Sequence, residues 1–201
     1  MPSQLEFIRI QTPKGKIKFS GKADDFFDIL DNTQGITEEF LYAHQPTTKE
    51  TIPIYSTSDK SIGNLDTKYI PKSFIIIDGP AIVVARKGYA GRLFVVEDNK
   101  FIVHEDAYPI KPKKEYSDAV NLWWFACHYS IEFQTDRTSF WGIGDFPRER
   151  FRNQEIIIPT MDFQEEVSEL YRRRILLLHK INRFKEDFHT KIESVINTLS
   201  P

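Results

Sequence analysis

Several features that would place this chain in a common protein class are missing from its sequence. Cys127 is the one cysteine, which excludes an internal disulfide framework and a cysteine-based zinc site. No stretch of about 18 apolar residues is present, as a membrane-spanning helix would require. The first residues lack the basic stretch and apolar core of a secretory signal. We therefore expect a cytoplasmic protein that does not enter a membrane.

The motifs of well-known enzyme families are missing as well. There is no Walker loop, no His-Glu-x-x-His, no Gly-x-Ser-x-Gly and no catalytic motif of a DNA methyltransferase. One weaker pattern is present, because Asp78 followed by Asp98-Asn99-Lys100 has the order in which many nucleases hold Mg²⁺. Asp98-Asn99 is also a turn composition, and we favour a hairpin turn there. The chain is thus predicted not to be an enzyme and to hold no metal or cofactor.

Charge is nearly balanced along the chain, with a net value of −2. This argues against a simple electrostatic grip on nucleic acid, because proteins that bind phosphates are usually basic. The distribution is uneven, however: residues 1–60 hold seven basic side chains against nine acidic ones. Basic side chains gather instead near residues 86–92, 111–114 and 148–152. Such local patches can form a footprint on a neutral body.

Short runs with the composition of β-strands dominate the first 115 residues. They are β-branched or aromatic and are bounded by Gly, Pro, Asp or Asn. Helical spacing occurs at residues 22–31, 37–44 and 117–130, and the last of these is apolar enough to be buried. We predict an α+β fold, mixed and mostly β, with a few helices. The predicted strands cover residues 5–10, 16–19, 51–55, 73–78, 81–85, 92–96, 101–104 and 155–158.

Residues 160–201 follow a different pattern. Apolar side chains recur there at alternating steps of three and four, which is typical of a coiled coil, and Arg174 occupies one seam position. Such a helix would reach roughly 50 Å, too far to fold back on its own domain. We predict a globular domain over residues 1–159 and a long helix over 160–201 that forms a homodimer. The predicted partner contacts are Val167, Leu170, Leu177, Ile181, Phe184, Phe188, Ile192 and Val195.

Three stretches, taken in order, carry a family resemblance. The first combines residues 35–40 with Ile-Pro-Ile-Tyr-Ser-Thr-Ser at 52–58. The second is Ala-Ile-Val-Val-Ala-Arg-Lys-Gly-Tyr-Ala-Gly-Arg at 81–92, leading to residues 104–108. The third is Phe-Arg-Asn-Gln-Glu-Ile-Ile-Ile-Pro at 151–159. Together with the helix that follows, they resemble the target-recognition domains of Type I restriction–modification specificity subunits, over about residues 35–198.

This resemblance implies a mixed α/β domain that reads a few base pairs of double-stranded DNA in the major groove. It also implies a helix that pairs antiparallel with another, and a separate methyltransferase subunit that binds S-adenosylmethionine and performs the chemistry. Full specificity subunits carry two recognition domains and two helices, whereas this chain has one of each. Three interpretations stay open: a half-subunit that homodimerises, a truncated chain, and a recognition component of a related Type II enzyme.

Side chains suited to DNA recognition fall on three predicted loops. Arg suits guanine and Asn or Gln suits adenine, while hydroxyls and Lys hold phosphates. Any one of these residues could equally be an ordinary solvated surface residue, and we favour function for the loops as a group. Arg148 and Arg150 are candidate phosphate partners. The predicted DNA contacts are Ser56, Thr57, Ser58, Arg86, Lys87, Tyr89, Arg92, Arg137, Thr138, Ser139, Arg148 and Arg150.

A different class of function is also compatible with the sequence. The β domain could bind a polypeptide while the helix dimerises, which would make the chain a protein-interaction adaptor. The near-neutral charge suits that alternative. Steeply salt-dependent DNA binding would separate the two, because neutralising phosphates releases counterions.

Overall fold

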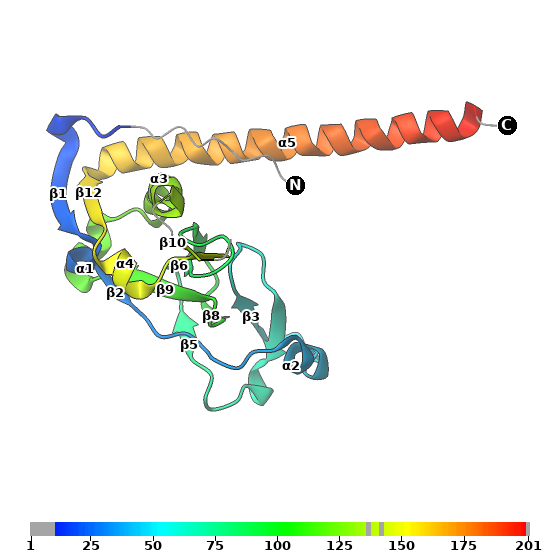
Figure 1. Cartoon of the computed structure of the whole chain (residues 1–201), viewed down its shortest axis with the longest axis horizontal. Helices are drawn as coiled ribbons and strands as arrows, with labels where there is room; N and C mark the ends of the chain where they lie inside the picture. Colours follow the sequence, from blue (N-terminus) through cyan, green and yellow to red (C-terminus); the bar gives the residue numbers. More distant parts are fainter. Residues whose placement is uncertain (1–10, 136–137, 141–142, 200–201) are drawn as a thin grey trace.

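Two four-stranded sheets form the centre of the computed structural model, which describes residues 11–135, 138–140 and 143–199 (Figure 1). In the first sheet all neighbouring strands are antiparallel. In the second, β3 and β8 run parallel and the other neighbours antiparallel. The first sheet has the order β2 (Phe27–Ile29), β9 (Ala107–Pro112), β6 (Ala81–Ala85), β7 (Leu93–Val96), and the second has the order β4 (Gly63–Asp66), β3 (Thr51–Tyr55), β8 (Lys100–Val103), β5 (Ile76–Asp78).

Strand β6 shows why the two sheets stack. All five of its residues are buried, and successive side chains point to opposite faces. Ile82 and Val84 enter the largest apolar cluster, together with helix α3 (Leu122–Thr135). Val83 points the other way, into a second cluster shared with Phe101 of the second sheet. The first sheet therefore lies between α3 and the second sheet.

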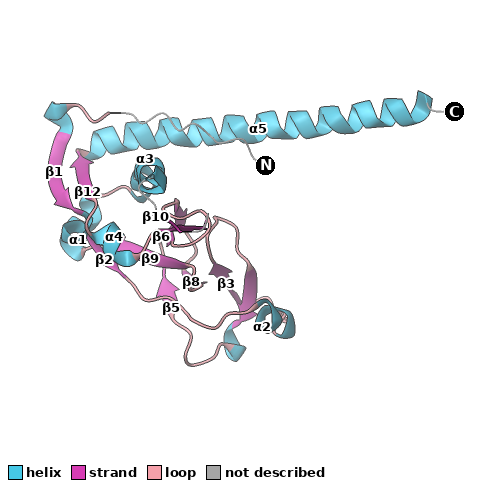
Figure 2. Cartoon of the chain, viewed as in Figure 1, coloured by secondary structure: helices cyan, strands magenta, loops and turns pink. Residues whose placement is uncertain are grey.

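Short elements surround this core. Among them are the helices α1 (Ala23–Phe26), α2 (Glu38–Ala43) and α4 (Arg148–Arg152), the 3-10 turns Lys14–Lys16, Thr67–Tyr69 and Lys114–Ala119, and the paired strands β10 (Thr138–Phe140) and β11 (Ile143–Asp145). The Thr37 hydroxyl caps α2 by accepting from the Phe40 N–H. α2 covers a third apolar cluster over the second sheet (Figure 2).

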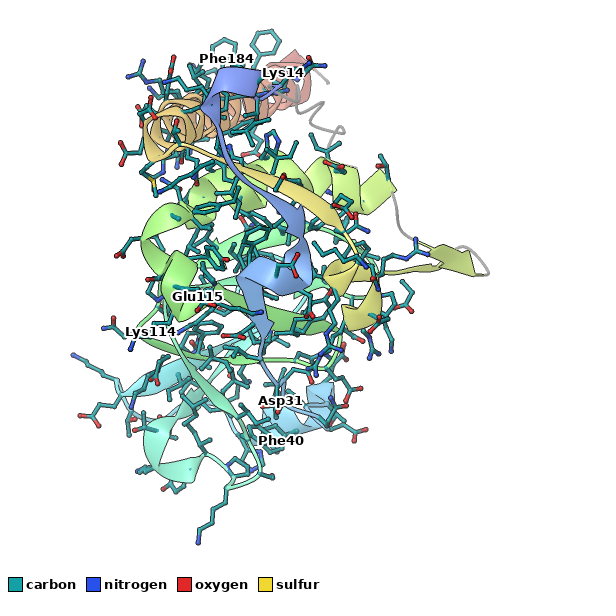
Figure 3. All side chains as sticks on the ribbon, turned by 90° about the vertical axis from the view of Figure 1, so that its left-hand side faces the viewer. Lys14, Asp31, Phe40, Lys114, Glu115 and Phe184 are labelled. Carbon is teal, nitrogen blue, oxygen red and sulfur yellow. The ribbon has the colours of Figure 1, made fainter. Side chains whose placement is uncertain are left out.

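An arch of two strands connects the sheets to the C-terminal helix. β1 (Ile17–Lys22) and β12 (Glu155–Pro159) pair antiparallel, with Ile17 opposite Pro159. Helix α5 (Met161–Leu199) begins where β12 ends. Figure 3 looks along α5 and shows β1 and β12 descending together from the helix toward the sheets. The strand pair thus fixes where the helix leaves the domain.

Helix α5 has a buried start and an exposed remainder. Val167 and Tyr171 are 2% and 3% exposed and belong to the largest cluster. The prediction that Val167 contacts a partner helix is therefore wrong, because its side chain packs inside its own domain. The Gln164 amide is buried too, donating to the carbonyls of Ala119 and Pro159 at 2.8 Å each. Farther along, Leu177, Ile181, Phe184 and Phe188 are exposed, and the helix extends well past the domain (Figure 1). Among the described residues, no helix combines the length and the hydropathy of a membrane span.

The mixed architecture and most predicted strands are confirmed, and the long helix forms as expected. The predicted helix over residues 22–31 is wrong: α1 has only four residues, and β2 follows directly. Phe27 and Ile29 pair with Pro112 and Ile110 of β9. This pairing to a central strand outweighs the weak helical spacing of the segment. The predicted strand at residues 5–10 lies outside the described residues.

One further local prediction is wrong, and a predicted buried helix is confirmed with shifted bounds. The segment 98–100 is not a hairpin turn, because β7 and β8 belong to different sheets and the segment crosses between them. The Asn99 carbonyl accepts there from the Gly79 N–H at 2.9 Å. The helix predicted over 117–130 instead spans Leu122–Thr135. Asn121 and not Ser117 caps it, since the Asn121 side chain accepts from the Trp124 N–H at 3.0 Å.

Candidate nucleic-acid interface

Three segments that are distant in sequence converge beside the first sheet. They are the β6–β7 loop (residues 86–92), the segment that follows β3 (56–62) and the chain between β11 and α4. Arg92 of the first binds Asp59 of the second at 3.2 Å. Lys87 forms an isolated backbone bridge with Asp145, and the Arg86 carbonyl accepts from the Phe146 N–H at 2.8 Å. The fold therefore joins predicted loops into one surface.

Glycines shape the β6–β7 loop. Gly88 and Gly91 have φ of +65° and +83°, in the left-handed region that favours glycine. A Cβ on Gly91 would lie 2.3 Å from the Phe133 carbonyl oxygen, so the loop is pressed against the end of α3. The Gly91 N–H donates to the Ala85 carbonyl at 2.9 Å, which closes the turn.

This turn presents Lys87 and Tyr89 to solvent. Tyr89 is 54% exposed, and the Arg92 guanidinium lies 5.7 Å from its ring centroid. Lys87 pairs with Asp106 at 3.2 Å. The loop thus offers an exposed aromatic ring and two cations, and each of the two cations pairs with an acidic neighbour.

The segment after β3 contributes hydroxyl groups. Ser56, Thr57 and Ser58 are half-buried, and the Ser58 hydroxyl donates to the Lys60 carbonyl at 3.3 Å. Tyr55 just before them donates to Asp98 at 2.7 Å. Burial, reinforced by Asp98, raises the pKa of Tyr55 to about 12, so its phenol stays protonated at neutral pH.

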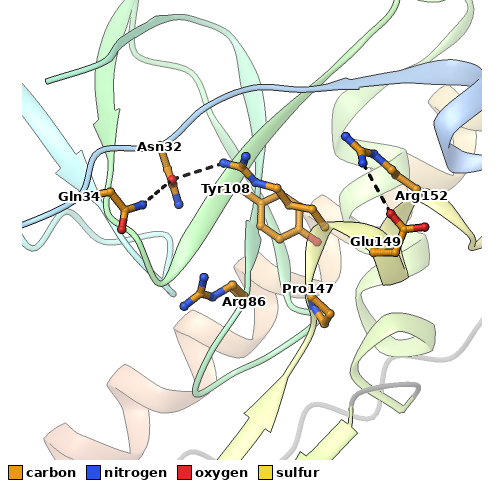
Figure 4. Close-up of a pocket in the computed structure, with 8 residues that line it drawn as sticks. Asn32, Gln34, Arg86, Tyr108, Pro147, Glu149 and Arg152 are labelled. Carbon is orange, nitrogen blue, oxygen red and sulfur yellow. Dashed lines mark hydrogen bonds and ion pairs between the residues drawn. The ribbon is translucent and has the colours of Figure 1, made fainter. Parts of the chain in front are cut away.

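A polar hollow of about 460 Å³ lies beside these loops (Figure 4). Arginines from two segments face it, Arg86 from the β6–β7 loop and Arg148 and Arg152 from α4. The last two sit on one face of that helix because they are four residues apart. The lining consists of Asn32, Gln34, Arg86, Tyr108, Pro147, Arg148, Glu149 and Arg152.

Two of these arginines, Arg148 and Arg152, already form ion pairs or hydrogen bonds with acidic and carbonyl groups. Arg148 pairs with Asp31 at 3.3 Å and also donates to the Leu30 carbonyl and the Asn32 side chain. Arg152 pairs with Asp24 at 3.4 Å and with Glu149 at 3.6 Å. Part of the positive charge on the wall of the hollow is therefore already neutralised.

Tyr108 belongs to the buried side of the hollow. Its ring is fully buried, its hydroxyl donates to the Phe146 carbonyl at 3.3 Å, and Arg148 lies 5.9 Å from its ring centroid. Burial raises the pKa of Tyr108, partly opposed by Arg148. The phenol is thus a neutral structural group, not an acid or base.

Some predicted contacts are not placed by the structure. Arg137 lies outside the described residues, and for Thr138 and Ser139 only the backbone of β10 is described. Arg150 is half-buried on α4 and does not line the hollow. The sequence did not predict Asn32 or Gln34 as part of the site, and it indicated Arg152 only as a member of the basic stretch 148–152. Asn32 and Gln34 follow β2 in an acidic stretch, and an acidic composition does not predict a contact with DNA.

Among the described residues, no three potential metal ligands of the His, Cys, Asp or Glu type lie together. Asp98 of the possible nuclease pattern is engaged by the Tyr55 hydroxyl, and Asp78 lies opposite Lys100 in the strand register. The surface presents hydrogen-bond donors, cations and an aromatic ring, which suits binding of a polar anionic partner.

Comparison with protein families gives one match. Residues 19–183 match the family model described as Type I restriction modification DNA specificity domain. The comparison with curated proteins found no significant match.

Solved structures show the same fold at low sequence identity. The Type-I restriction-modification system S subunit from M. genitalium aligns with a TM-score of 0.59 and 15% identity over 87% of this chain. The HsdS subunit from Thermoanaerobacter tengcongensis aligns with 0.56 and 11% over 87%. A structure described as showing complex assembly and conformational transition of the type I R-M system aligns with 0.66 and 10% over 92%. This chain spans 45%, 41% and 45% of those chains, respectively.

Proposed function

Because the chain belongs to the family of Type I restriction–modification DNA specificity domains, we propose that it recognises one part of a DNA target with the surface described above. The observation that carries the proposal is the convergence of the β6–β7 loop, the segment after β3 and the end of β11 into one surface, with α4 beside it across the hollow. The Arg92–Asp59 pair and the Lys87–Asp145 bridge hold it together. Base edges lie within the grooves, so a reader needs donors on convex segments that are held rigidly.

We assign different tasks to different parts of this surface. Lys87, Tyr89 and Arg92 of the β6–β7 loop are the proposed groove contacts. The hydroxyl groups of the segment after β3, which lie beside this loop, suit base edges or phosphates. The cations of α4 lie at the edge of the surface, where phosphate contacts set the register of the protein on the duplex. The remaining proposed contacts are Ser56, Thr57, Ser58, Arg86, Arg137, Thr138, Ser139, Arg148 and Arg150.

We further propose that the chain performs no chemistry itself and docks on a separate methyltransferase subunit, which would bind S-adenosylmethionine. The structural similarity to a protein described in terms of assembly of the type I R-M system supports this. No cofactor site is proposed on this chain.

The exposed stripe of α5 is the proposed contact with a second copy. Leu170, Leu177, Ile181, Phe184 and Phe188 are 49–71% exposed and repeat at steps of three and four. The half-buried Arg174 occupies the position between Leu170 and Leu177. Ile192 and Val195, whose side chains are not described, continue the spacing. A symmetric dimer of this kind would read two half-sites related by a two-fold axis.

Binding to duplex DNA by the full chain tests the proposal. The full chain, alone and with its methyltransferase, selects duplexes from a randomised library, and fluorescence anisotropy then follows affinity as salt is raised. We expect two half-sites related by two-fold symmetry and a steep fall of log K with log salt. Inserting five base pairs between the half-sites turns one away from its domain, which should abolish tight binding. If the chain binds no DNA either alone or with its methyltransferase, the alternative of a protein-interaction adaptor is favoured.

A further inference from the structure

Arg86 differs from the other arginines around the hollow. Its backbone is fully engaged, since its N–H donates to the Asp106 carbonyl and its carbonyl accepts from the Phe146 N–H, each at 2.8 Å. Its guanidinium, in contrast, has no hydrogen bond or ion pair among the described residues, and its enclosed Nε is without an acceptor. Enclosing a charged donor without an acceptor is unfavourable, so this group is suited to a ligand that supplies one.

The carboxylates around the hollow contact the other two arginines. Arg148 pairs with Asp31 and Arg152 with Asp24 and Glu149, so three carboxylates match three arginines in number, but none of them contacts Arg86. Among the described residues, the Arg86 guanidinium is therefore the cation of the hollow that has no carboxylate partner. A phosphodiester carries one negative charge, and its two free oxygens match the parallel donors of a guanidinium.

The shape of the site separates a phosphate from a base. Base edges are recessed in a groove and are reached by protruding groups such as the exposed Tyr89. Phosphates protrude from the duplex, and a hollow can receive them. Figure 4 shows the Arg86 guanidinium on the wall of the hollow, with Gln34 and Asn32 above it. The concave shape thus favours a backbone phosphate.

We propose that this hollow binds one phosphodiester of the DNA backbone, with Arg86 as the charged donor and Gln34 as a neutral neighbour at its edge. Within this hollow Arg148 is a positioning residue instead of the phosphate contact first proposed for it, because its contacts with Asp31 and Asn32 hold the two sides of the hollow together. The inference rests on the proposed function and goes beyond it by separating a phosphate-holding arginine from those that support it.

Salt dependence of binding to the selected duplex tests this assignment. One phosphate contact contributes about 0.9 to the slope of log K against log salt. For each half-site bound, Arg86→Gln should lower affinity about tenfold at low salt and reduce the slope by about 0.9, so the slope for a dimer on two half-sites should fall by about 1.8. The factor should be the same on selected and unrelated duplexes. Arg86→Lys keeps the charge and should keep the slope. Arg173→Gln removes a guanidinium that pairs with Glu169 on α5, and serves as the matched control.

A second measurement locates the contact on the DNA. An uncharged methylphosphonate replaces each phosphate of the selected duplex in turn. At one position per half-site this replacement should weaken binding by the wild type but leave the affinity of Arg86→Gln unchanged. Thermal unfolding of each variant checks that the fold is intact. A changed ranking of sequences at constant slope would assign Arg86 to a base and overturn the proposal, as would an unchanged affinity. A wild-type chain that binds no duplex would remove the proposed function as well.

Discussion

At the scale of single residues, the interface depends on backbone geometry as much as on charge. Gly91 brings the β6–β7 loop against the Phe133 carbonyl, and the cations of the loop take their positions from that contact. Gly88 has a similar positive φ but no atom within 4 Å of a built Cβ. The two glycines therefore allow steric contact to be separated from backbone strain.

We predict that Gly91→Ala destabilises the protein much more than Gly88→Ala. A left-handed φ costs an alanine about 1–2 kcal/mol, and displacing the end of α3 adds about 1–3 kcal/mol. Gly88→Ala meets only the first of these costs. Urea unfolding gives both free energies. Equal losses would mean that the loop moves away from α3 at little cost.

Residue types on the interface were predictable from the sequence, but their partners were not. Arg86, Lys87 and Arg92 were predicted as DNA contacts because they flank glycines in a loop. Nothing in the sequence shows that Asp59 pairs with Arg92 while Arg86 has no partner among the described residues, because those contacts form between distant segments. The amides of Asn32 and Gln34 were missed for the same reason.

At the scale of elements, the junction between β1 and α5 has an electrostatic component. The ammonium of Lys16, in the 3-10 turn directly before β1, contacts the carboxylate of Asp162 in the first turn of α5. Its hydrogen bond is the main cause that lowers the pKa of Asp162 to about 2. Because the folded pKa lies below that of an unfolded Asp, near 3.9, this contribution to stability is present above about pH 4 and is lost as the pH falls toward 2.

Replacing Asp162 by Asn should therefore flatten the acid end of the stability profile. We expect the free energy of unfolding to fall less between pH 5 and pH 2.5 in Asp162→Asn than in the wild type, because the side chain at position 162 then has no proton to gain. Urea titrations at both pH values measure this. Asp118→Asn, at an exposed carboxylate with no ion pair among the described residues, is the control and should track the wild type.

Elements were predictable where a buried run is bounded by turn residues. The strands at residues 51–55 and 81–85 were predicted with their observed bounds, since Gly, Pro or polar residues flank both. The helix predicted over residues 22–31 was wrong because the pairs of apolar residues in this segment fit both helical and strand spacing. Pairing with β9 selects the strand. β4, β10, β11 and α4 are short and depend on neighbours that only the folded chain provides.

At the scale of the whole molecule, α5 is both part of the core and the proposed dimer contact. Its first turns bury Val167 and Tyr171, so a cut after Pro159 would remove core residues along with the exposed stripe. A cut after Arg174 keeps the buried residues and removes most of the stripe. This shorter deletion is the sharper test of association.

We predict that the full chain has about twice its 23.6 kDa mass in light scattering, and that the chain ending at Arg174 is a folded monomer. Phe184→Glu should also weaken the dimer, because it introduces a charge into the apolar seam. Lys185→Glu, at the exposed neighbouring position off the seam, should not. A full-length monomer, with its methyltransferase absent, would contradict homodimerisation.

The existence of the long helix was predictable at this scale, but its direction was not. The direction follows from the register of β1 with β12 and from Gln164, whose amide holds the Asn121 backbone and the Pro159 carbonyl. Heptad spacing carries no information about those contacts.

The pairing of β1 with β12 also has a consequence for synthesis on the ribosome. The first described strand must wait for a partner that begins at Glu155, after nearly the whole module has been translated. Long-range pairing of this kind is slow to close, and an unpaired strand edge is prone to wrong pairing in the meantime. Closure cannot begin before β12 has been translated, so β1 stays without its strand partner during the synthesis of most of the module.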